Sequence, residues 1–130
     1  MGPVVDTSVL IDYFAGVNNR ETNTFDELLD EGVAPAIVPV IAQEFLQGFT
    51  SASDLAKARG YLSPLERLEA PTYETHELAA ALHIDGRRSG ETVPTVDTLI
   101  VTMARESGRA LLTRDRHQKV LAKIAGVSLA

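Results

Sequence analysis

Four acidic side chains stand at positions from which they could hold a metal ion. Asp6 and Asp115 each follow a short apolar run that predicts a β-strand. Ligands of open parallel sheets bind beyond the carboxyl ends of the strands, so two strands would each deliver a carboxylate to the same edge. Each aspartate has an alternative interpretation as the N-cap of the helix that follows, because Asp is among the residues favoured there.

The other two acids, Glu44 and Asp97, lie on predicted helices. Glu44 stands in the segment 38–46, which is apolar almost all round, and a buried carboxylate is costly unless it is paired or bound to a metal. Glu44 could instead emerge at the edge of the buried face or pair with an arginine. Asp97 lies in the first turn of its helix, where the helix dipole alone favours an acid.

The four acids indicate a metal site as a set, because each alone has another interpretation. Two like charges 4 Å apart repel by about 4 kcal/mol at an effective dielectric constant of 20, so clustered acids need cations or protonation. The chain has no Cys, and its histidines lack metal-site spacing, so His76, His83 and His117 are interpreted as surface or packing residues. Carboxylate oxygens without Cys or paired His select hard cations, here Mg²⁺ with Mn²⁺ as the alternative.

Strands and helices alternate along the chain, and this order would position the acids. The expected strands are 3–6, 34–38, 67–70, 110–113 and 127–129. The expected helices are 7–14, 24–31, 39–48, one from Ser51 or Ser53 to 62, one from Thr72 or Thr75 to about 90, 95–108 with Thr95 as cap, and 116–125. The alternation predicts the α/β class, with a mostly parallel sheet covered by helices on both faces.

Length and composition fit one globular domain over residues 1–130 and exclude several classes of protein. No run of about 18 apolar residues occurs, so no membrane span is expected. The lack of Cys excludes disulfides and thiolate zinc sites and fits a cytoplasmic protein. The net charge of -6 argues against a protein that coats nucleic acid through bulk electrostatics.

Four segments resemble the motifs of the PIN-domain nucleases, in matching order and spacing over nearly the whole chain. They are Val4–Asp12, Gln43–Gly48, Val96–Ile100 and Leu111–Asp115. More narrowly, the chain resembles the VapC toxins of type II toxin–antitoxin systems. The resemblance implies a three-layer α/β/α sandwich with a central, mostly parallel sheet of about five strands. It also implies a Mg²⁺-dependent endoribonuclease that hydrolyses RNA by metal-activated water, forms a homodimer and is covered by a cognate antitoxin.

The resemblance also implies roles for individual residues. The expected catalytic and metal-binding residues are Asp6, Glu44, Asp97 and Asp115. The expected supporting residues are Thr7, Ser8 and Thr113. Asp12 matches an acid that is more often structural than metal-binding. His117 occupies the place of a second acid that often follows Asp115, so no fifth acidic ligand is expected.

An acidic nuclease must recruit phosphate locally, through metal ions and a few arginines. Arg114 and Arg116 flank Asp115 and are the RNA-contact candidates, with ordinary solvated arginine as an equally weighted alternative. Two other functions stay open: an RNA-processing nuclease of this fold without an antitoxin, and a non-catalytic protein-binding module on the same scaffold. Such a module would be expected to lose one of the four acids, and the sequence keeps all four.

Overall fold

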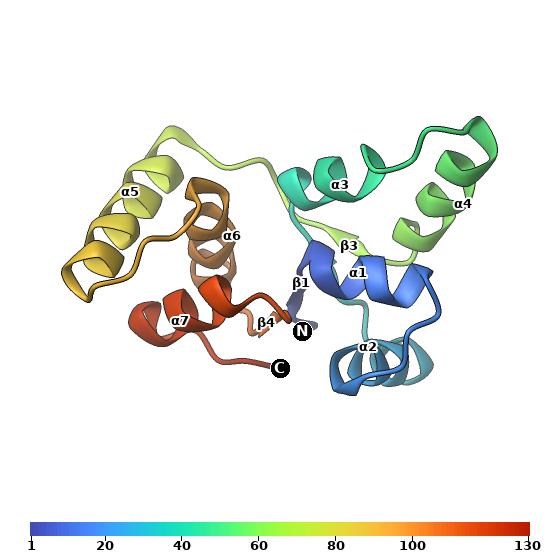
Figure 1. Cartoon of the computed structure of the whole chain (residues 1–130). Coiled ribbons are helices and arrows are strands. Elements are labelled where there is room, and N and C mark those ends of the chain that lie inside the picture. Colours follow the sequence, from blue (N-terminus) through green and yellow to red (C-terminus); the bar gives the residue numbers. More distant parts are fainter.

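The central element is a parallel four-stranded sheet in a computed structural model that describes all residues 1–130 (Figure 1). The strands are β1 (Val4–Val5), β2 (Ala36–Ile37), β3 (Glu66–Arg67) and β4 (Leu111–Leu112). Their order is β3-β2-β1-β4, and every neighbouring pair is parallel. Leu129 adds one isolated parallel bridge to Leu111. Segments from the two ends of the chain therefore lie side by side at β1 and β4.

Helices cover the sheet from two sides (Figure 1). One group comprises α1 (Thr7–Phe14), α2 (Arg20–Asp30), α3 (Pro39–Leu46) and α4 (Ala52–Leu62). The other group comprises α5 (Tyr73–Arg88), α6 (Thr95–Glu106) and α7 (Arg116–Ala125), which pack against one another. The predicted α/β/α sandwich with a parallel sheet is confirmed. The sheet has four strands instead of about five, because the segment 127–129 contributes only the single bridge at Leu129.

The register of β1 against β4 fixes where the site residues emerge. Val4 pairs with Leu111 and Val5 with Leu112, and all four side chains are fully buried. The backbone N–H of Asp6 donates to the carbonyl of Leu112 at 2.9 Å, which extends the pairing by one residue. Parallel strands in register end at the same edge of a sheet, so the residues that follow β1 and β4 leave the sheet together.

Helix starts differ from the sequence prediction where local capping decides them. The second helix begins at Arg20 instead of 24, because Asn19 and Thr22 form a reciprocal capping box with their side chains and backbones. Thr95 is the first residue of α6 and not its cap, since Pro94 holds the cap position. Ser51 and Thr72, each one of two predicted alternatives, cap α4 and α5.

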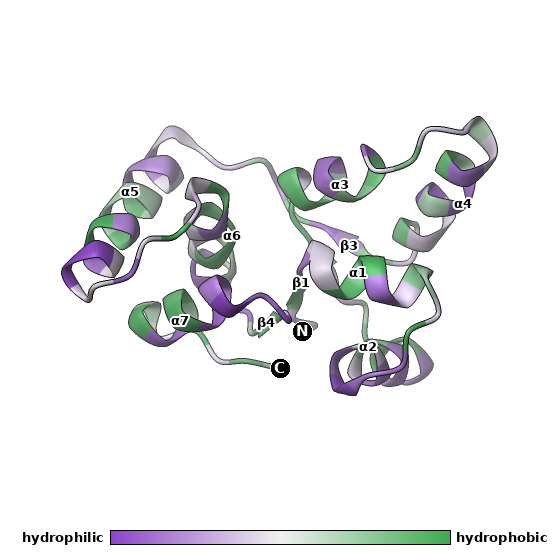
Figure 2. Cartoon of the chain, in the orientation of Figure 1, coloured by the Kyte–Doolittle hydropathy of each residue, from purple (hydrophilic) through white to green (hydrophobic).

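One hydrophobic cluster of 24 buried residues lies between the sheet and the helices. It draws on every strand except β3, an edge strand whose two residues are exposed. Figure 2 shows α2 mostly hydrophilic, in keeping with the acidic run at its C-terminal half. No helix has the length and apolar character needed to span a membrane.

Candidate active site

Asp6 leaves β1 and serves both as a helix cap and as a buried acid. Its side chain is the N-cap of α1 and accepts a hydrogen bond at Oδ2 from the backbone N–H of Ser8 at 3.0 Å. The hydroxyl of Thr113, which follows β4, donates to the same Oδ2 at 3.4 Å. Asp6 is only 4% exposed, so its carboxyl group is surrounded almost entirely by protein atoms and has little contact with water. The capping interpretation of Asp6 is therefore correct, and it does not exclude a further role.

Asp115 caps the helix that follows β4, as Asp6 caps the helix that follows β1. Its Oδ1 accepts from the backbone N–H of Gln118 at 2.9 Å. The Thr113 hydroxyl accepts from the backbone N–H of Asp115 at 3.0 Å. Because Thr113 also donates to Asp6, a single buried hydroxyl links the two strand-end aspartates.

Gln118 joins Asp6 to Asp97, the acid in the first turn of α6. Its amide Nε2 donates to Asp6 Oδ1 at 2.7 Å and to Asp97 Oδ1 at 3.0 Å. The side chain of Gln118 is fully buried, and its Oε1 has no hydrogen-bond partner. Sequence reasoning missed this residue. A usable signal existed, because Gln118 is a polar residue on the buried stripe of α7 that continues with Leu121 and Ala122.

Asp97 is the acid whose ionisation the fold disfavours most clearly. Burial raises the pKa of Asp97 above its ordinary value, and the nearby charges of Asp115 and Asp6 raise it further. The hydrogen bond from Gln118 and the neighbouring His117 act in the opposite direction but do not cancel the increase in pKa. A cation at this position would favour the charged carboxylate and remove the penalty.

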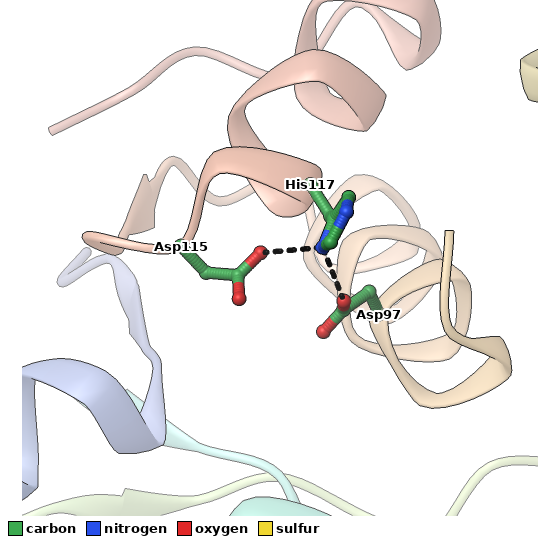
Figure 3. Close-up of side chains that lie close together, drawn as sticks. All are labelled: Asp97, Asp115 and His117. Atoms are coloured by element: carbon green, nitrogen blue, oxygen red, sulfur yellow. Dashed lines mark ion pairs between the residues drawn. The ribbon is translucent and has the colours of Figure 1, made fainter. Parts of the chain in front are cut away.

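His117 faces the same space from the first turn of α7. Its Nδ1 lies 3.9 Å from Asp115 Oδ1 and 4.0 Å from Asp97 Oδ2, and Figure 3 shows both carboxylates turned toward the ring. These three side chains offer ligand atoms that all lie within 4.8 Å of one another. Sequence reasoning placed His117 among surface or packing residues, because its acidic neighbour on α6 is distant along the chain.

Glu44 lies on α3, outside the group formed by Asp97, Asp115 and His117. It is half-buried on α3, and its Oε1 accepts from the Thr7 hydroxyl at 3.1 Å. Thr7 directly follows Asp6, so Glu44 is joined to the same edge of the sheet through α1. The group of side chains close enough to share a cation contains Asp97, Asp115 and His117, but neither Asp6 nor Glu44.

The two RNA-contact candidates differ in their surroundings. The Arg114 guanidinium donates from Nη1 to Asp12 Oδ2 at 2.7 Å and lies 3.9 Å from Glu21 Oε2, while its backbone N–H donates to the Ser8 hydroxyl. Much of the charge of Arg114 is therefore already paired. Arg116 is exposed and forms no ion pair within 4.0 Å, which leaves it the better placed of the two to meet a phosphate.

The donor set fits a hard divalent cation. No lysine or arginine forms an ion pair with Asp6, Asp97 or Asp115, so their negative charges are not neutralised by a fixed salt bridge. Carboxylate oxygens are the ligands that Mg²⁺ and Mn²⁺ prefer. Two of these acids are almost fully buried, and a buried charge without a counter-ion is costly. A bound cation is the simplest compensation that these residues allow.

The parallel sheet, the flanking helices and the acids at one sheet edge match a known family. The PIN domain model matches residues 4–124, and the chain therefore belongs to the PIN domain family. Among curated proteins it is similar to VapC ribonuclease Mb1587 of Mycobacterium bovis and to ribonuclease VapC11 of Mycobacterium tuberculosis. Each is 28% identical over 129 residues, covering 98% of this chain and 96% of the relative.

Solved structures share the fold at lower sequence identity. VapBC2 from Rickettsia felis, bound to a DNA fragment from its promoter, matches with a TM-score of 0.79 and 18% identity, covering 100% of this chain and 98% of that chain. A toxin–antitoxin complex from Klebsiella pneumoniae matches with a TM-score of 0.72 and 24% identity, covering 97% and 95%. At these identities the likeness establishes the fold.

Proposed function

We propose that this protein is a divalent-metal-dependent endoribonuclease and the toxin of a type II toxin–antitoxin pair. The observation that carries the proposal is the convergence of Asp6, Asp97 and Asp115, linked through Thr113 and Gln118, at one edge of the sheet with no lysine or arginine between them. Membership of the PIN domain family and similarity to proteins named VapC ribonucleases support the same reaction.

The cofactor is Mg²⁺, with Mn²⁺ as the alternative. Held by these carboxylates, a divalent cation would supply activation of water as the nucleophile and stabilisation of the charge on the leaving oxygen. Asp97 and Asp115 would hold the cation, together with Asp6, which Gln118 links to Asp97. The Thr113 hydroxyl and the Ser8 N–H orient Asp6. Glu44, whose carboxylate accepts from the Thr7 hydroxyl, is assigned the orientation of the attacking water.

The substrate is RNA presented as a single strand or loop, because the attack on phosphorus needs an exposed backbone. Exposed Arg116 guides a phosphate toward Asp115. Arg114 contributes less, because Asp12 and Glu21 already pair with its guanidinium. The net charge of -6 makes any long-range attraction of RNA weak, so recognition depends on these local contacts and on the cation.

The proposal extends to the whole chain and its partners. Residues 1–130 form one nuclease domain that acts in the cytoplasm as a homodimer. A cognate antitoxin covers the acidic site and keeps it from RNA. An arginine or lysine of that antitoxin, inserted between Asp97 and Asp115, would neutralise the same charges that a cation does.

The test is cleavage of RNA by the purified, antitoxin-free protein. Total RNA is incubated with Mg²⁺ or with EDTA, and the new ends are mapped. We expect Mg²⁺-dependent cuts that leave a 5′-phosphate and a 3′-hydroxyl. Asp6→Asn should abolish cleavage and keep the fold, as judged by circular dichroism. Full metal-dependent activity in Asp6→Asn would show that the assignment of the site is wrong.

A further inference from the structure

The imidazole of His117 stands at the open side of the acidic cluster without bonding to it. Its Nδ1 lies 3.9 Å from Asp115 Oδ1 and 4.0 Å from Asp97 Oδ2. Both separations are beyond the 2.7–3.2 Å of an N–H···O hydrogen bond. One third of the His117 side chain is exposed, so solvent and ions reach it. Potential ligand atoms of Asp97, Asp115 and His117 therefore face one another without a hydrogen bond between His117 and either acid (Figure 3).

The spacing of these atoms suits a bridging cation. Bonds of about 2.1 Å place two ligand atoms on opposite sides of Mg²⁺ at most about 4.2 Å apart, with slightly larger values for Mn²⁺. The three atoms at Asp97, Asp115 and His117 all lie within 4.8 Å of one another. For the three side chains to share one cation, the half-buried His117 and Asp115 must rotate toward Asp97.

Hydrogen bonds already engage the oxygens on the other side of the cluster. Gln118 Nε2 occupies Asp6 Oδ1 and Asp97 Oδ1. Asp6 Oδ2 accepts from the Ser8 N–H and the Thr113 hydroxyl. Asp97 Oδ2 has no hydrogen-bond donor, and it is the oxygen that faces His117. Of the two oxygens nearest the imidazole, Asp97 Oδ2 is therefore free to bind a cation, whereas Asp115 Oδ1 also accepts from the Gln118 backbone N–H at 2.9 Å.

We propose that His117 binds the catalytic cation through Nδ1, together with Asp97 and Asp115, so that the site has mixed nitrogen and oxygen ligands. The catalytic role of this cation rests on the proposed nuclease function, whereas the ligand set rests on the geometry of the three side chains. Both Mg²⁺ and Mn²⁺ bind carboxylate oxygens well, but Mn²⁺, as a first-row transition metal, accepts an imidazole ligand more readily than Mg²⁺ does. The site therefore favours Mn²⁺ over Mg²⁺ by more than a site built from carboxylates alone.

The direct test is spin-echo EPR of Mn²⁺ bound to the wild-type protein. We expect nitrogen modulation from a coordinated imidazole, and a change of its frequency when the histidines are labelled with ¹⁵N. The chain has three histidines, and His76→Asn is the matched control because His76 is exposed on α5, outside the site. His76→Asn should keep the modulation and His117→Asn should lose it. Absence of nitrogen modulation in the wild-type protein would overturn the proposal.

Calorimetric titration with each metal gives a second readout that needs no RNA. His117→Asn should weaken Mn²⁺ binding at least about tenfold, the lower end of what loss of even an outer-shell partner costs, and weaken Mg²⁺ binding much less. His117→Asp should bind Mg²⁺ at least as well as the wild type, with a lower ratio of Mn²⁺ to Mg²⁺ affinity. Unchanged affinities for both metals in His117→Asn would overturn the proposal and leave His117 as a neighbour of the site.

The outcomes separate this inference from the proposed function. Mg²⁺-dependent RNA cleavage without nitrogen modulation would leave the nuclease standing and remove His117 from the ligands. Nitrogen modulation in a protein that cleaves no RNA would leave the ligand set standing and overturn the nuclease.

Discussion

Two buried acids with the same exposure lie in opposite electrostatic surroundings. Glu21 on α2 and Asp97 on α6 are each 7% exposed. Glu21 is surrounded by three cations, with Arg20 at 3.4 Å, Arg114 at 3.9 Å and Lys119 at 4.0 Å. Asp97 has no lysine or arginine within 4.0 Å and instead meets Gln118, His117 and further acids. Burial alone therefore does not distinguish a structural acid from a candidate metal ligand, but the charge around it does.

Neighbouring residues of one loop, Arg114 and Asp115, contact Glu21 and Asp97 respectively. Arg114 pairs with Glu21 and Asp12, and the next residue, Asp115, faces Asp97 and His117. The ion pairs of Arg114 with Asp12 and Glu21 therefore help to hold the backbone next to Asp115 in place. Arginine and lysine side chains of the protein neutralise the charge of Glu21. The charge of Asp97 has no such partner and would be neutralised by a bound cation.

The largest expected difference between the two acids is in catalysis. Asp97→Asn should lower RNA cleavage by about a hundredfold or more, the upper end of what loss of a partner in a metal site costs. Glu21→Gln should retain near wild-type cleavage and lose about 1 kcal/mol of stability, because its cations are partly exposed. The measurements are initial rates of cleavage and urea unfolding. Equal loss of activity in both variants would show that the two acids belong to one network.

The next largest effect is expected at Gln118, which takes the place of a cation between Asp6 and Asp97. Gln118→Leu removes the amide that both acids accept from, and we expect it to cost about 1–3 kcal/mol of unfolding free energy in EDTA. Saturating Mg²⁺ should reduce this loss, because the cation supplies part of the missing compensation. A loss that is the same with and without Mg²⁺ would mean that the amide contributes only to packing.

The smallest expected effect is the pH dependence that Asp97 adds to stability. Folding raises the pKa of Asp97 above its ordinary value of 3.8, so the folded protein binds this proton more tightly than the unfolded chain does. The resulting stabilisation is fully present below pH 3.8 and is lost as the pH rises through the elevated pKa. In EDTA, the unfolding free energy of the wild type should therefore fall relative to Asp97→Asn over that window. Parallel pH profiles would contradict this.

Much of the fold follows from local sequence patterns. The helices Thr7–Phe14 and Arg116–Ala125 were predicted with their observed bounds, since each has an aspartate cap and an apolar stripe. The parallel sheet follows from the alternation of strands and helices. The start of α2 was not predicted, because the pair of Asn19 and Thr22 does not match the usual Ser/Thr and Glu capping pattern. The single bridge at Leu129 depends on long-range pairing with Leu111, which a sequence pattern does not reveal.

For the site, the sequence by itself determined which acids were candidates: Asp6 and Asp115 follow strands, and strand ends in a parallel sheet share an edge. Only the tertiary structure decided which of them meet. The packing of α7 against α6 carries Gln118 and His117 to Asp97, across about twenty positions of chain. The physical reason is that a sequence specifies local propensity, whereas the compensation of a buried charge depends on every element packed around it.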